Sequence, residues 1–215
     1  MKRKRLKLAF TGTLLIVAFA VWTVLIQTVD VQCIGVNGTE VGFATVNSLL
    51  KSKIGVNMTL YSITDWLGLV PVAICFIFGI YGFVQLIKRK SLLKVDSDIL
   101  ISGIYYAVVA VFYLIFEINP INYRPILING IMEASYPSST TLLVLCVMPT
   151  LVYNINRRTE SIILNKFVFI LTVLFTAFMV IGRLISGVHW VTDIIGSVLL
   201  STGMFNIFRA LLYKD

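Results

Sequence analysis

The chain has 215 residues, of which 58% are hydrophobic and only 13% are charged. Soluble domains average about 45–50% apolar and about 25% charged residues, so the composition excludes an ordinary soluble domain. The formal net charge of +8 is gathered in short clusters between long uncharged runs, as in a membrane protein. We therefore expect a single integral-membrane domain over residues 1–215 that contacts the lipid bilayer, and no nucleic-acid partner.

The uncharged runs predict the membrane-spanning helices. A spanning helix needs about 20 mostly apolar residues. Four runs reach that length outright, and two more are shortened only by Arg183 and Asp193 near one end. The runs are 8–29, 66–87, 99–116, 134–156, 167–182 and 194–208. The first run follows the basic "MKRKRLK" but is longer than the apolar part of a signal peptide, which has about 7–15 residues. We therefore expect it to be a retained spanning helix. The predicted fold class is all-α, a bundle of six transmembrane helices.

The basic residues predict the orientation of this bundle. Six spans place both termini on one side with the loops 88–98 and 157–166, and that side holds fourteen of the eighteen Lys and Arg residues. Basic residues gather on the cytoplasmic side of membrane proteins. Both termini are therefore expected in the cytoplasm. The segment "VGFATVNSLLKSKIG" (residues 41–55) would then lie outside, either as an interfacial helix on the membrane or, equally, as a surface loop.

A charged cluster interrupts the apolar sequence near its carboxyl end. The stretch "GRLISGVHWVTD" (residues 182–193) carries Arg183, Asp193 and the only histidine of the chain, His189. His189 and Asp193 are four residues apart, so on a helix they share one face. A carboxylate that accepts one ring N–H leaves the other nitrogen free as a nucleophile or base. We predict that His189 and Asp193 are catalytic.

Groups that bind an anion are expected at the same face. Arg183 and Arg124, which lies in the loop 117–137, can hold a phosphate-like anion in bidentate fashion. Ser138 is a suitable N-cap for the fourth span, and the helix start there adds backbone N–H groups, including that of Ser139. This set predicts phosphoryl transfer through a phosphohistidine without a cofactor. One His and one Asp fall short of the usual ligand count for a metal.

These residues resemble the type 2 phosphatidate phosphatase superfamily, which shares its site with the vanadium haloperoxidases. That family has three sequence blocks: Lys-x6-Arg-Pro, Pro-Ser-Gly-His and Ser-Arg-x5-His-x3-Asp. Here the third block is "GRLISGVHWVTD", with Gly182 in place of the serine, the second is "PSST" (137–140), and the first is "EINPINYRP" (117–125). The resemblance covers about residues 66–212 and implies a six-helix membrane phosphatase.

Two positions depart from the family pattern. Glu117 stands where the family has its lysine, and Thr140 where it has a histidine that protonates the leaving oxygen. An alkoxide is a poor leaving group without an acid, because its conjugate acid has a pKa near that of water, about 16. A phosphate monoester, with a second pKa of about 6, leaves far more easily. The missing acid therefore favours a diphosphate ester as substrate. Glu133 is a candidate replacement acid.

The sequence thus predicts an integral-membrane lipid phosphatase whose site faces the extracytoplasmic side. The favoured substrate is a polyprenyl diphosphate such as undecaprenyl diphosphate, and a phosphatidate-type lipid is also possible. The alternative is a degenerate homologue that binds lipid phosphate headgroups without turnover. A transporter or channel is disfavoured, because the inner parts of the spans lack ionisable residues. The oligomeric state stays open.

Overall fold

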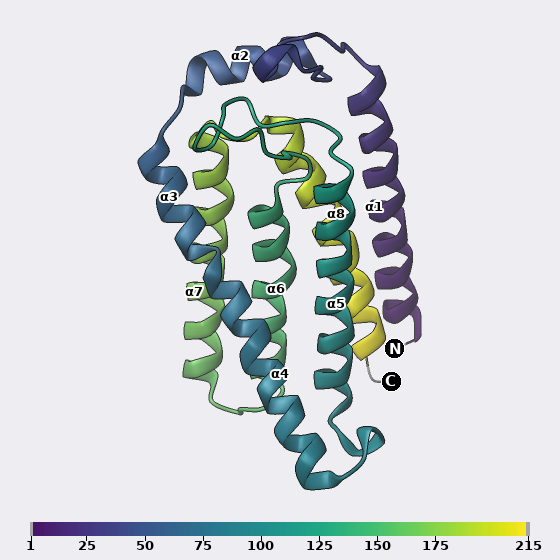
Figure 1. Cartoon of the computed structure of the whole chain (residues 1–215). Coiled ribbons are helices and arrows are strands. Elements are labelled where there is room, and N and C mark those ends of the chain that lie inside the picture. The colour runs from purple at the N-terminus through teal and green to yellow at the C-terminus, as the bar shows by residue number, and fades with distance from the viewer. Residues whose placement is uncertain (1, 214–215) are drawn as a thin grey trace.

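The computed structural model describes residues 2–213, which form α-helices joined by loops of different lengths (Figure 1). The described helices are α1 (Lys2–Thr28), α2 (Ala44–Ile54), α3 (Met58–Leu67), α4 (Leu69–Arg89), α5 (Ser97–Ile118), α6 (Ser139–Asn156), α7 (Ile162–Ile185) and α8 (Val191–Leu212). Two single 3-10 turns, Val36–Gly38 and Leu92–Lys94, lie in the connections.

Within residues 2–213, six helical stretches are long and apolar enough to cross a membrane. They are α1, the continuous stretch Met58–Arg89 formed by α3 and α4, and α5 to α8. The predicted all-α fold with six long apolar helices is therefore confirmed. The second stretch begins at Met58, earlier than the predicted residue 66, because Asp65 lies within the helix and pairs with Arg183 from α7. The side of the membrane on which each end lies stays a prediction.

The most extensive helix contact joins the two ends of the chain. α1 and α8 run side by side (Figure 1), and Gly12 and Gly203 lie where they touch. A Cβ built on Gly12 would lie 2.9 Å from the carbonyl oxygen of Gly203, and one on Gly203 would lie 3.0 Å from that of Gly12. Small residues permit such close approach between membrane helices. This contact fixes α8, whose amino end carries Asp193, within the bundle.

α2 lies across one end of the bundle, and α1 begins and α8 ends at the opposite end (Figure 1). Lys51 of α2 donates to the carbonyl oxygen of Pro125 at 2.8 Å, and Asn47 donates to the hydroxyl of Thr192 at 3.1 Å. α2 is therefore tied both to the loop 119–138 and to the start of α8. A helix does form within the predicted segment 41–55, and its position on a membrane surface remains a prediction.

The loop 119–138 folds back on itself beneath α2. The backbone N–H of Arg124 donates to the carbonyl oxygen of Glu133 at 3.1 Å, and that of Ser135 donates to Asn122 at 3.0 Å. The indole of Trp190 donates to the carbonyl oxygen of Tyr123 at 2.8 Å. These bonds hold the loop against the start of α8 and bring Arg124 and Ser135 beside His189.

Candidate active site

Asp193 is fixed at the start of α8 by the helix end itself. Trp190 is the N-cap, and its backbone N–H donates to Asp193 Oδ2 at 2.9 Å. A carboxylate in the first turn of a helix is further stabilised by the positive end of the helix dipole. The Asp193 side chain is fully buried. Its position is therefore set by local geometry before any contact with His189 is considered.

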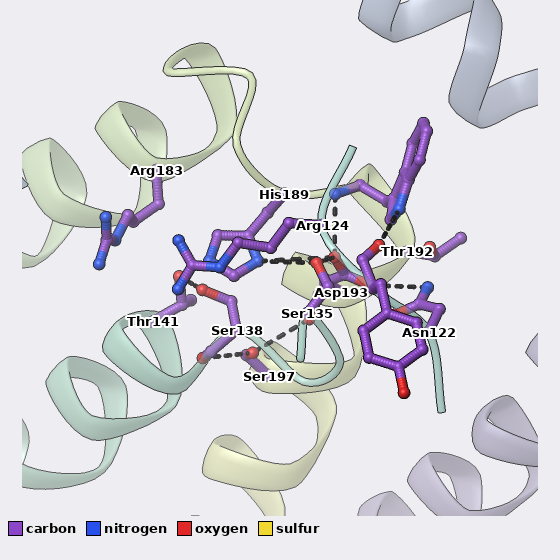
Figure 2. A network of polar contacts seen from close by, with 12 residues as sticks. Asn122, Arg124, Ser135, Ser138, Thr141, Arg183, His189, Thr192, Asp193 and Ser197 are labelled. Carbon is purple, nitrogen blue, oxygen red and sulfur yellow. Dashed lines mark hydrogen bonds and ion pairs between the residues drawn. The ribbon is translucent and has the colours of Figure 1, made fainter. Parts of the chain in front are cut away.

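Ser135 links His189 to Asp193 (Figure 2). The Ser135 hydroxyl donates to Asp193 Oδ2, and its oxygen lies 3.1 Å from His189 Nδ1. Nδ1 is also 3.5 Å from Asp193 Oδ2, and Asn122 donates to Asp193 Oδ1 at 3.2 Å. Because the single hydroxyl proton of Ser135 goes to Asp193, its oxygen can only accept, which places the ring proton on Nδ1. The lone pair of His189 is then on Nε2.

His189 Nε2 is buried and has no hydrogen-bond partner within residues 2–213. Burial lowers the pKa of His189 to about 4; the charges of Arg124 and Arg183 add to the lowering, and Asp193 opposes it. In Figure 2 the guanidinium groups of both arginines lie on the side of the ring away from Asp193. The ring is therefore neutral at ordinary pH, and its free nitrogen faces a positively charged space.

Each arginine is held at one nitrogen and leaves the others free. Nη2 of Arg183 lies 2.7 Å from Asp65 Oδ1 and also donates to Thr140 Oγ1. Nη2 of Arg124 lies 3.1 Å from Glu133 Oε2. Nε and Nη1 of both arginines are buried and, in the described part of the chain, have no partner. Buried N–H groups without acceptors cost about 1–3 kcal/mol each, more when charged, so this arrangement favours an anion between them.

Tyr61 packs against both guanidinium groups. Its ring centre lies 4.9 Å from Cζ of Arg183 and 5.5 Å from Cζ of Arg124. Cations at this distance from an aromatic face are attracted to it. Tyr61, on α3, therefore helps to hold two like charges close together.

Ser138 and Ser139 mark the start of α6. The Ser138 hydroxyl donates to Thr141 Oγ1 at 3.0 Å, and Ser197 of α8 donates to the Ser138 carbonyl oxygen at 2.9 Å (Figure 2). The first turn of a helix has N–H groups without intrahelical acceptors, and here that turn begins at Ser139. That Ser138 and Ser139 bind phosphate remains a prediction. The N–H groups of this first turn are the donors that would contact the phosphate.

The two glutamates singled out in the sequence differ in their surroundings. Glu117 is exposed near the end of α5 and, among the described residues, forms no ion pair. Glu133 pairs with Arg124. In residues 2–213 there is also no group of three or more His, Cys, Asp or Glu side chains placed to hold a metal ion.

Four residues of this site were not found from the sequence: Tyr61, Asp65, Asn122 and Ser135. Asp65 directly precedes the uncharged run 66–87, and an acidic residue beside a long apolar run is itself a signal of a functional position. Ser135 and Asn122 carry no sequence signal that separates them from other loop residues.

A family comparison covers the part of the chain that carries most of these side chains. The PAP2 superfamily model matches residues 102–215, which is more than half of the chain and includes Arg124, Arg183, His189 and Asp193. The chain belongs to the PAP2 superfamily. The resemblance drawn from the three sequence blocks is thereby confirmed. The match begins after α3, so Tyr61 and Asp65 lie outside the part of the chain that defines PAP2 membership.

A solved structure extends the comparison to the whole bundle. The chain is similar to the structure described as "Crystal structure of the first transmembrane PAP2 type phosphatidylglycerolphosphate phosphatase from Bacillus subtilis", with a TM-score of 0.57 and 20% identity over 94% of each chain. This likeness shows that the chain has the fold of a transmembrane PAP2 protein. Comparison with curated proteins gave no match.

Proposed function

We propose that this protein is an integral-membrane lipid phosphatase that transfers a phosphoryl group to His189 at the extracytoplasmic face. The observation that carries the proposal is the set of buried atoms without partners in residues 2–213: Nε and Nη1 of Arg124, Nε and Nη1 of Arg183, and Nε2 of His189. Four donor nitrogens of two guanidinium groups beside one lone pair match a phosphoryl group, which has several acceptor oxygens and one electrophilic phosphorus. Such preformed donors stabilise the charge of the transition state.

An apolar groove, lined in part by the Asp65 and Thr140 side chains that contact Arg183, supports a lipid as the carrier of the phosphate. The groove has a volume of about 510 Å³ and lies between α4, α5 and α6. Asp65, Ser139 and Thr140 line its polar part, and residues such as Leu69, Val72, Val109 and Leu143 line the rest. The polar part of the groove can take the phosphate head of a lipid, and the apolar part can take its hydrocarbon chain. The extracytoplasmic position is supported by the distribution of basic residues along the sequence.

The first step follows from the geometry of His189. Nε2 attacks the phosphorus, the N–P bond forms, and the bond to the leaving oxygen breaks with its electron pair on that oxygen. Asp193, through Ser135, holds the ring proton on Nδ1 and stabilises the positive charge that the ring acquires. Arg124 and Arg183 bind the equatorial oxygens. Thr140 offers no acid to the leaving oxygen, so a phosphate leaving group, with a second pKa of about 6, departs more readily than an alkoxide.

This leaving-group argument favours a polyprenyl diphosphate, such as undecaprenyl diphosphate, over a lipid monophosphate. A monophosphate is the second substrate class, since the similar Bacillus subtilis structure is that of a phosphatidylglycerolphosphate phosphatase. General acid assistance is worth about 10²–10⁴-fold. We therefore expect kcat/KM for the diphosphate to exceed that for the monophosphate by about 10²-fold or more.

Phosphate release from purified protein in detergent tests the proposal. We expect release from both substrates, faster from the diphosphate, and none from His189→Ala. Arg183→Gln should lower kcat/KM by about 10–100-fold, the value of a lost charge-assisted hydrogen bond of about 1.5–3 kcal/mol. Arg89→Gln is the matched control, because Arg89 is an exposed arginine that pairs with Asp96 at the opposite end of the bundle. Binding of both lipids without any release would favour the alternative, a homologue that binds without turnover.

A further inference from the structure

The proposed phosphohistidine must be hydrolysed, and neither His189, Asp193 nor Thr140 supplies a base for this step. Water has to lose a proton as its oxygen attacks phosphorus. His189 cannot accept that proton while it carries the phosphoryl group. Asp193 is already engaged at both oxygens, by Ser135 and the Trp190 N–H at Oδ2 and by Asn122 at Oδ1. A threonine hydroxyl such as that of Thr140 is not a base at ordinary pH.

Asp65 is a carboxylate in the right neighbourhood. Its Oδ1 lies 2.7 Å from Arg183 Nη2, and the same nitrogen donates to Thr140 Oγ1. Asp65 therefore stands beside Thr140, where the sequence blocks of the family have their histidine. Its Oδ2 has no hydrogen bond within residues 2–213, and the side chain is 55% exposed. One oxygen is held by the phosphate-binding arginine, and the other is free to meet water.

The apolar groove indicates on which side of the phosphate Asp65 lies. Asp65, Ser139 and Thr140 line the polar part of this groove, whereas His189 does not line it. A lipid whose chain lies in the groove leaves along it after His189 has taken the phosphoryl group. In an in-line displacement the water of the second step enters from the side that the leaving group vacates. The base for that water must therefore line the groove, as Asp65 does.

We propose that Asp65 is the general base that hydrolyses the phosphohistidine, an inference that rests on the proposed function. The Asp65 carboxylate takes one proton from water while the water oxygen bonds to phosphorus. The N–P bond breaks, and its electron pair returns to His189 Nε2. Inorganic phosphate then departs, and Asp65 releases its proton to solvent through its exposed side. Because Asp65 lies on α3, before the residues matched by the family model, this chain would supply from another helix a base that its second block, with Thr140 in place of the histidine, cannot provide.

The test is to separate the two half-reactions in Asp65→Asn. The substrate is a polyprenyl diphosphate with a radiolabelled terminal phosphate, and the protein is the full chain in detergent. We expect one equivalent of polyprenyl monophosphate per chain in a rapid burst, labelled protein that persists, and steady phosphate release lowered by about 10²–10⁴-fold. Asp65→Glu keeps the carboxylate and should restore part of the release. A residue that only shaped the site would slow the burst as well.

Glu133→Gln is the matched control, because it removes the carboxylate that pairs with the other arginine, Arg124. It should not cause labelled protein to accumulate. Unchanged phosphate release from Asp65→Asn would overturn the role of Asp65. So would a burst that Asp65→Asn slows as much as it slows steady release, when Asp65→Glu keeps the burst of the wild type. If wild-type protein releases neither product, the proposed function itself fails, and the two failures are thereby distinguished.

Discussion

His189 combines burial with an unpartnered nitrogen, a costly arrangement for a residue with a merely structural role. Its Nδ1 is held by Ser135 and Asp193, while Nε2 faces the two arginines without a partner in the described residues. Burial and the neighbouring guanidinium groups lower the pKa of the ring to about 4. The protonation state needed for nucleophilic attack is therefore set by the surroundings of the ring.

The single histidine makes this claim measurable. In histidine-labelled protein the NMR signal of His189 should titrate near pH 4, well below the ordinary value of about 6.5. Asp193→Asn should lower the midpoint further, because Asp193 raises the pKa. The unfolded chain binds the proton more tightly than the folded one, so this residue's contribution to stability is complete above pH 6.5 and declines as the pH falls toward 4. A midpoint at 6.5 or above would contradict the described environment.

At the scale of single helices, some elements were predictable from the sequence and others were not. α8 begins at Val191, between His189 and Asp193 of the third sequence block. The start of α8 was predictable from that block, because four residues in sequence keep the two side chains close to one helix start. α3 begins at Met58 rather than at the predicted residue 66, because the helix accommodates the charged Asp65. Only the fold shows that its charge is balanced by Arg183, which is 118 residues away in the chain. The same holds for Ser135, whose role depends on how the loop 119–138 folds back.

The contact between α1 and α8 gives a prediction about stability. Gly12→Ala should destabilise the protein by about 1–3 kcal/mol, as overpacking does, because the new Cβ would meet the backbone oxygen of Gly203 at 2.9 Å. Gly79→Ala is the control, since a Cβ there has nothing within 4 Å. Thermal unfolding in the same detergent should give a lower Tm for the first variant only. Equal Tm values would show that the two helices are not as closely packed as described.

At the scale of the whole molecule, the site and the described chain ends occupy opposite ends of one bundle. α2, the loop 119–138 and the start of α8 lie at one end, and the start of α1 and the end of α8 lie at the other (Figure 1). Helix number and order followed from apolar run lengths, which depend only on the bilayer thickness. The polar site required side chains from α3, α6, α7 and α8 to meet, and run lengths alone contain no information about that.

Cys33 tests the orientation of this bundle. It is the exposed cysteine among the three, and it follows α1 at the same end as α2, whereas Cys75 and Cys146 lie within the long apolar helices. If that end is extracytoplasmic, a membrane-impermeant maleimide should label this protein in intact cells. Cys33→Ser should abolish the labelling of the protein. Labelling that requires permeabilised cells would place the site in the cytoplasm and contradict the predicted topology.

The central claim is that His189 carries the phosphoryl group between substrate and water, and trapping that intermediate tests it most directly. Wild-type protein is mixed with polyprenyl diphosphate labelled in its terminal phosphate, quenched in alkali within the first turnover, digested and analysed by mass spectrometry. A phosphohistidine survives alkali and is lost in acid. The account predicts an acid-labile phosphate on the peptide that contains His189 and none in His189→Ala. Phosphate release with no labelled protein at any quench time, or label on a serine or threonine instead, would contradict it.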